Sequence, residues 1–183
     1  MNVFKFFIIF SLVSIFFLPA QSSQKDILNG LFNQLEKVDN FKTAEQLEQK
    51  IWFIWNKHPN NIKLTEKLEF GTELMQYGSY SYALKVFDNI IATDSSWSEA
   101  WNKRATVFFL MNQYKKSLND IEKVLNIESR HFGALSGQAR IFIKLQEYEK
   151  AIISLKTALK FYPSFKAGEL IPEIERLIKD ESI

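Results

Sequence analysis

Residues 98–131 read SEAWNKRATVFFLMNQYKKSLNDIEKVLNIESRH, and this stretch decides the fold. It holds two amphipathic segments of helical length, joined by a short polar turn before Tyr114. The same pattern occurs on both sides at an interval of 34 residues. A fixed repeat with two helices per unit predicts an all-α solenoid in which each unit buries its apolar face against the next. The recurring residues form four sets: Tyr80, Tyr114 and Tyr148; Ala83, Ser117 and Ala151; Phe87, Ile121 and Leu155; and Gly71, Ala105 and Ala139.

Within each unit, large, small and aromatic residues follow one another in an order that resembles the tetratricopeptide repeat (TPR). The resemblance implies a TPR α-solenoid of antiparallel helix pairs in a right-handed superhelix, closed by a C-terminal capping helix. We expect the repeats at residues 64–97, 98–131 and 132–165. The runs 101–106 and 130–135 are also similar to a family of small exported bacterial TPR proteins, which implies export and fold but no reaction.

The segments that flank these repeats are also helical in pattern. Residues 23–63 lack the small residue and the turn tyrosine, and we interpret them as a degenerate N-terminal helix pair. Trp52 and Trp55 lie three positions apart on its second helix, which predicts burial beneath the first regular repeat, with exposure of one ring for binding as the alternative. Residues 166–183 are predicted to form the capping helix, starting near Ile171 because Pro172 fits only a first helical turn or a kink.

The first 22 residues differ from the rest of the chain. Lys5 is followed by an apolar run to Leu18, and small residues then allow cleavage after Ala20 or Ser22. This layout predicts a cleaved signal peptide over residues 1–22 and hence export, to the periplasm in a Gram-negative cell. An uncleaved membrane anchor is the alternative, although the run is shorter than the ~20 residues of a spanning helix.

The composition argues against several classes of function. The formal net charge is +2 with no block of like charges, which does not favour nucleic-acid binding. Cysteine is absent, and neither His58 nor His131 has a second ligand at metal-binding spacing. No phosphate loop or nucleophile motif is present. We therefore expect no enzyme activity, no cofactor and no metal, and we assign His131 to helix capping.

The inner, concave surface is the predicted working surface. In a TPR stack, the second, fifth, ninth and twelfth positions of each first helix share one face. Asn102 is suited to a peptide backbone and Arg140 to a carboxylate, but the lysines, asparagines and arginine of the TPR class that binds chaperone tails are missing. Arg104 falls at a position that normally packs inward, and we expect it to pair with Asp88 or Asp120. The predicted partner-binding residues of the groove are Met75, Glu99, Asn102, Thr106, Phe109, Ser136, Arg140 and Ile143.

These features predict a non-catalytic protein–protein interaction module, an exported TPR adaptor or scaffold that binds a peptide or partner helix in its groove. The alternative is an envelope assembly or structural protein that acts through self-association as a homo-oligomer. We expect contact with the membrane only transiently, through the signal peptide. An enzyme is the least favoured class.

Overall fold

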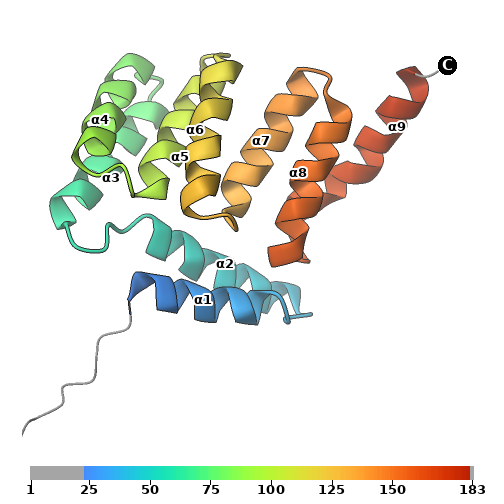
Figure 1. The fold of residues 1–183 in the computed structure, drawn as a ribbon, viewed down its shortest axis with the longest axis horizontal. Coiled ribbons are helices and arrows are strands. Elements are labelled where there is room, and N and C mark those ends of the chain that lie inside the picture. Colours follow the sequence, from blue (N-terminus) through green and yellow to red (C-terminus); the bar gives the residue numbers. More distant parts are fainter. Residues whose placement is uncertain (1–22, 182–183) are drawn as a thin grey trace, which may run out of the picture.

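The computed structural model describes residues 23–181, so the predicted signal peptide lies outside the described part. Within it, three antiparallel helix pairs stack side by side (Figure 1). The pairs are α3 (Ile62–Gln76) with α4 (Tyr80–Thr93), α5 (Ser98–Leu110) with α6 (Tyr114–Ile127), and α7 (Phe132–Lys144) with α8 (Tyr148–Phe161). Residues 23–181 contain no strand, and the predicted all-α solenoid of antiparallel helix pairs is confirmed.

The tight turn inside each pair requires a left-handed residue, because the first helix must stop and reverse within a few residues. Gly78 supplies it in the first pair with φ 73°, and Asn112 and Gln146 occupy the same position in the next two with φ 57° and 59°. Small residues then let the helices approach. A Cβ added to Gly71 would lie 2.6 Å from the Phe87 ring, and the Ser117 hydroxyl donates to the Ala105 carbonyl at 2.7 Å.

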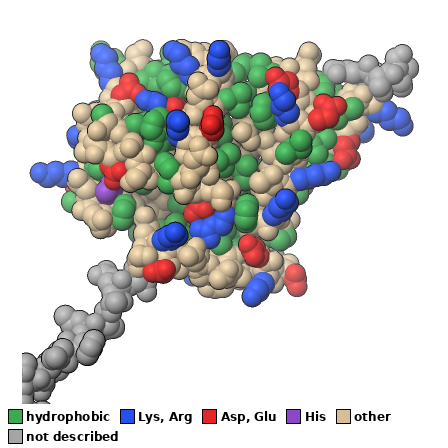
Figure 2. Space-filling view, in the orientation of Figure 1, with side chains coloured by type: hydrophobic (Ala, Val, Ile, Leu, Met, Phe, Trp, Pro, Cys, Tyr) green, Lys and Arg blue, Asp and Glu red, His purple; other side chains and the backbone are tan. Residues whose placement is uncertain are grey.

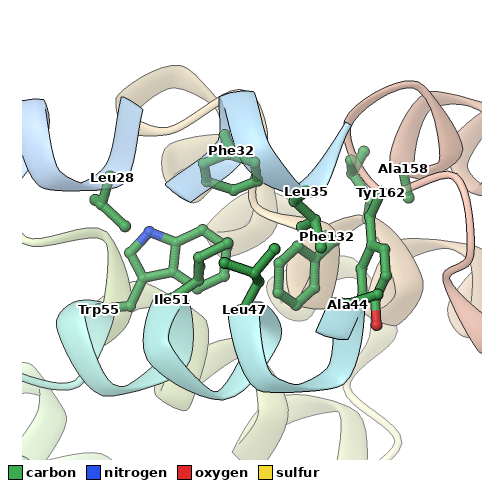
Figure 3. Packing of buried hydrophobic residues seen from close by; sticks show 11 residues of the cluster. Leu28, Phe32, Leu35, Ala44, Leu47, Ile51, Trp55, Phe132, Ala158 and Tyr162 are labelled. Atoms are coloured by element: carbon green, nitrogen blue, oxygen red, sulfur yellow. The ribbon is translucent and has the colours of Figure 1, made fainter. Parts of the chain in front are cut away.

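The N-terminal helices do not stack on the first repeat as a further repeat of the solenoid would. Helices α1 (Gln24–Leu35) and α2 (Phe41–Trp55) form a hairpin that runs across the lower end of the stack (Figure 1). The hairpin buries its apolar face mainly against α7 and α8, which lie much later in the chain. Figure 3 shows this core, whose buried members are Leu28, Phe32, Leu35, Ala44, Leu47, Ile51, Trp55, Phe132, Leu135, Ala158 and Tyr162.

The two tryptophans of α2 therefore lie elsewhere than the sequence predicts. Trp55 is 3% exposed and stacks on His131 with ring centroids 3.9 Å apart, and Trp52 meets Phe132 edge-to-face at 5.5 Å. The prediction of burial beneath the first regular repeat is wrong: both rings pack at the start of α7, in the third repeat. Both also face the protein, because the hairpin meets α7 across a broad surface rather than along one narrow stripe.

The last repeat is covered by a short helical tail. A 3₁₀ helix, Lys166–Leu170, leads into α9 (Ile171–Glu181), which starts at the residue that the position of Pro172 indicates. Ile174 is buried against the cluster formed by Ala139, Tyr148, Ala151 and Leu155. Within residues 23–181, no helix has the length and apolar character needed to cross a bilayer.

Arg104 ties three helices together. Its guanidinium donates to Asp120 of α6 at 2.7 and 2.8 Å and to Asp88 of α4 at 2.7 Å, so the prediction of pairing with these acids is confirmed for both. The charge also lies over the Trp101 ring, 4.8 Å from its centroid. Bidentate pairing of this kind holds the pKa of Arg104 above its ordinary value.

Candidate partner-binding groove

A cavity of about 350 Å³ lies on the inner face of the second and third repeats. We call it the groove cavity. Its apolar lining includes Met75 and Phe109, together with Ala105, Ile121 and Ala134. Six of the predicted partner-binding residues line it, namely Met75, Asn102, Thr106, Phe109, Ser136 and Arg140.

Two residues that the sequence did not place here also line the groove cavity. Trp52 enters from α2, and Phe165 enters from the segment after α8. A Cβ added to Gly133 would lie only 2.4 Å from Cη2 of Trp52, so the indole rests directly on the α7 backbone. The hairpin thus supplies part of the wall. Aromatic residues at 132, 162 and 165, all at one end of the third repeat, were the available signal that something packs there.

Glu99 is a correction to the predicted groove surface. Its side chain is fully buried, with no exposed area, and it is held by three neighbours. Lys103 Nζ lies 3.1 Å from Oε1, Asn102 donates to Oε1 at 3.1 Å, and His131 Nε2 lies 3.0 Å from Oε2. Burial alone would raise the pKa of Glu99, but Lys103, His131 and Asn102 outweigh it and hold the pKa below the ordinary value. Glu99 positions Asn102 and Lys103 and is not accessible to a partner.

Ile143 is a second correction, because it does not line the cavity. It packs toward α8 and α9, against the cluster around Ala139 and Leu155. Helical periodicity places Ile143 on the same side of α7 as Arg140, one turn further on. In the structure, however, its side chain packs against the neighbouring helices at the end of the stack. The apolar strip of the groove therefore ends at Phe109.

The charge of the groove cavity is one-sided. Lys103 and Arg140 line it, and Lys103 is paired with the buried Glu99 at 3.1 Å, which leaves Arg140 as the free charge. Arg140 is exposed and makes no ion pair within residues 23–181. On the face seen in Figure 2, by contrast, cationic and anionic side chains are interspersed with hydrophobic ones. The groove cavity thus combines an apolar surface with one unopposed positive charge, that of Arg140, which suits an acidic, partly apolar ligand.

A second cavity of about 460 Å³ lies beside it, between α2 and the inner face of α3. We call it the side cavity. Trp52 lines both cavities and separates them. Fewer inner-face residues of the first repeat are accessible here. Leu68 is only 1% exposed, and Thr65 accepts a hydrogen bond from the His58 backbone N–H at 2.9 Å. The remaining polar lining includes Glu69, Glu73 and Lys57.

A third cavity, also about 460 Å³, lies between the start of α1 and the turns before α5 and α7. Three of its charged side chains have partners: Arg130 pairs with Glu128 at 2.8 Å, and Asp94 lies 2.8 Å from His58 Nε2. Hydrogen bonding from Ser96 lowers the pKa of Asp94, with a smaller contribution from His58. These pairs hold the turns in place, and the exposed Lys25 is the charged lining residue that makes no ion pair within residues 23–181.

The two histidines have structural partners. His131 Nδ1 accepts from the Ala134 N–H at 3.1 Å, as the predicted cap of α7, and its Nε2 therefore donates to Glu99. His58 Nδ1 likewise accepts from the Asn60 N–H at 3.2 Å while Nε2 faces Asp94. Within residues 23–181, no group of three or more potential ligand side chains could hold a metal ion.

Known proteins share this architecture. A TPR repeat-containing protein of Rhizobium etli is 33% identical over 150 residues, which cover 82% of this chain and 73% of that protein. The chain belongs to the TPR proteins. The family model of anaphase-promoting complex (cyclosome) subunit 3 matches residues 76–158 of this TPR protein.

Solved TPR structures agree in fold. The first TPR domain of Spaghetti (RPAP3), bound to the HSP90 peptide SRMEEVD, superposes with a TM-score of 0.61 at 18% identity and covers 66% of this chain and 96% of that one. The translocator chaperone SycD of Yersinia enterocolitica type III secretion gives 0.61 at 15% identity, over 67% and 98%. TPR folds of this kind are protein-interaction scaffolds.

Proposed function

We propose that this TPR protein is an exported, non-catalytic adaptor that binds a peptide or a partner helix of another protein in its groove cavity. The observation that carries the proposal is the combination of an apolar surface with the exposed guanidinium of Arg140, which has no ion-pair partner within residues 23–181. Few residues usually dominate such an interface, and Phe109 and Arg140 are the anchors we expect. Related TPR structures in complex with HSP90 and HSP70 peptides support a peptide as the partner.

A crosslinked pull-down from an envelope extract tests the proposal. The bait is the tagged mature protein, compared with a Phe109→Ala/Arg140→Glu double variant and with Lys156→Glu, an exposed lysine on α8. We expect a protein that wild type and Lys156→Glu capture equally and that the folded double variant loses. Equal capture by all three proteins would show that the partner binds elsewhere than in the groove cavity.

Export is the second part of the proposal, and it rests on the apolar run and the small residues at positions 6–22. We expect a full-length tagged chain to be recovered from the periplasm in a form shortened by about 20 residues. Mass spectrometry of the purified N-terminus distinguishes cleavage after Ala20 or Ser22 from retention as an anchor.

Self-association is a second candidate function, favoured by one observation. The outer face of the hairpin exposes Phe53 by 62% and Ile27 by 41%, beside Leu31 and Ile54. Apolar residues gathered in this way often mark an interaction surface. Sedimentation at two salt concentrations tests the idea: a dimer that persists in high salt and is lost in Phe53→Ser supports it, and a strict monomer counts against it.

A further inference from the structure

The inner face of the molecule is divided into two cavities by a single side chain. Among residues 23–181, Trp52 is the one that lines both the groove cavity and the side cavity. This inference rests on the proposed function, because it concerns how a peptide held in the groove cavity continues. A peptide that runs from the groove cavity into the side cavity passes Trp52, the side chain that the two linings share.

Trp52 is a fixed divider rather than a mobile flap. Its ring rests against the backbone at Gly133, and its Nε1–H donates to Glu48 at 3.2 Å. Edge-to-face contacts with Trp55 at 5.3 Å and His131 at 5.6 Å hold it from the other side. A rigid aromatic surface between two cavities is suited to contact with a peptide backbone.

The free charges on the two sides of Trp52 have opposite signs. In the groove cavity, Lys103 is paired with the buried Glu99 at 3.1 Å, which leaves Arg140 as the free charge. In the side cavity, Lys57 is already paired with Glu69 at 2.9 Å. That pairing leaves Glu73, an exposed carboxylate with no partner within residues 23–181, as the uncompensated charge.

We propose that the two cavities together recognise one extended peptide whose charge changes sign along its length. An apolar side chain enters the groove cavity against Phe109, and a neighbouring acidic residue faces Arg140. The peptide then crosses Trp52, and a lysine or arginine on the far side faces Glu73. Both ionic contacts lie at the surface, so they select the sequence and direction of the peptide more than they add affinity.

A random heptapeptide display library tests the proposal on the mature protein. We expect wild type to enrich peptides in which an apolar residue lies between an acidic residue on one side and a basic residue on the other. Glu73→Lys should lower the enrichment of the basic residue about two- to fivefold, and Arg140→Glu that of the acidic residue similarly, as for exposed ion pairs. Glu66→Lys, which reverses another exposed carboxylate of α3, is the matched control and should behave as wild type.

The outcomes separate this inference from the proposed function. If wild type enriches nothing beyond a folded Phe109→Asp variant, the groove is not a peptide site and both ideas fail. If wild type enriches acidic, apolar peptides without a basic residue, or if Glu73→Lys matches Glu66→Lys, the groove proposal stands and the two-cavity proposal is overturned. Circular dichroism melts of every variant confirm that each remains folded.

Discussion

At the scale of single residues, the turn position shared by Gly78, Asn112 and Gln146 makes a direct prediction about stability. All three have positive φ, a conformation that costs a residue with a Cβ roughly 1–2 kcal/mol. Replacing Gln146 with Gly removes that strain, although the more flexible unfolded chain offsets about 0.5–1 kcal/mol of the gain. We expect a net stabilisation of roughly 0.5–1 kcal/mol, measured by urea unfolding.

The other two turns provide its controls. Gly78→Ala introduces the strain that Gln146→Gly removes, so it should destabilise by about 1 kcal/mol. Asn112→Gly should change little, because asparagine tolerates the left-handed region. If Gln146→Gly were less stable than wild type, the Gln146 side chain would contribute more free energy of folding than its left-handed backbone conformation costs.

The buried Glu99 predicts how stability depends on pH. Its pKa lies below the ordinary value of 4.5, so the unfolded chain binds the proton more readily than the folded chain. Its contribution is therefore complete above pH 4.5 and is lost as the pH falls through the lowered pKa. Asp94 and Glu128 act in the same direction, because their pKa values are also lowered.

Glu99→Gln isolates that contribution. We expect the variant to be less stable than wild type at neutral pH, because the charge opposite Lys103 is lost. Its melting temperature should fall less steeply than that of wild type as the pH decreases below the ordinary value of 4.5. Thermal melts across this range measure both, and parallel curves for the two proteins would contradict the assignment.

The same residue shows the limit of sequence reasoning about the site. Periodicity correctly indicates that Glu99, Asn102 and Arg140 share a side of the stack. It does not show what covers that side: Glu99 is enclosed by Asn102, Lys103 and His131, and Trp55 of α2 stacks on His131. The sequence allowed prediction of contacts that depend on spacing within one repeat or between adjacent repeats. The Arg104 ion pairs and the His131 cap are examples. Contacts that depend on the hairpin could not be predicted in this way.

At the scale of elements, the contact between α2 and α7 predicts the effect of one added methyl group. A Cβ on Gly133 would approach Cη2 of Trp52 to 2.4 Å, so Gly133→Ala must displace the indole. Overpacking of this kind costs typically 1–3 kcal/mol. Chemical denaturation should show that loss, and in a Trp52→Ala background the same substitution should cost much less, because the two residues are in direct contact.

Gly30→Ala is the matched control for that experiment. Gly30 lies inside α1 with nothing within 4 Å of an added Cβ, so the substitution should stabilise through helix propensity alone, by roughly 0.5–1 kcal/mol. Equal effects at Gly133 and Gly30 would show that Trp52 moves freely, and would remove the fixed divider from the groove.

The placement of α1 and α2 is the part of the fold that the sequence did not predict. Their apolar spacing is compatible both with stacking as a further repeat and with packing across the repeat ends, because periodicity defines a face and not its partner. The aromatic surface formed by Phe132, Tyr162 and Phe165 decides between the two. Those residues lie more than 70 positions from α2 in sequence, and only the folded chain brings them together.

At the scale of the whole molecule, the hairpin changes how the solenoid unfolds. In a simple repeat array each unit contacts only its neighbours, so the ends can open separately. Here Tyr162 donates to Glu48 at 2.9 Å across 114 positions of sequence, and Arg130 donates to Asn29 at 3.0 Å across 101. The hairpin thereby joins the beginning of the described chain to the third repeat.

Hydrogen exchange measured by mass spectrometry can detect that closure. Removing the Trp55 ring deletes its stacking on His131 and its contact with Phe132, whose centroid is 5.0 Å away. Trp55→Ala should therefore lower protection in α1, α2 and α7 together, with a smaller effect in α3 and α4. Phe87→Ala, an equally buried aromatic in the first repeat, should show the reverse order. If only neighbouring units were coupled, Trp55→Ala would leave α7 unchanged, because four helices, α3 to α6, separate α2 from α7 in the chain.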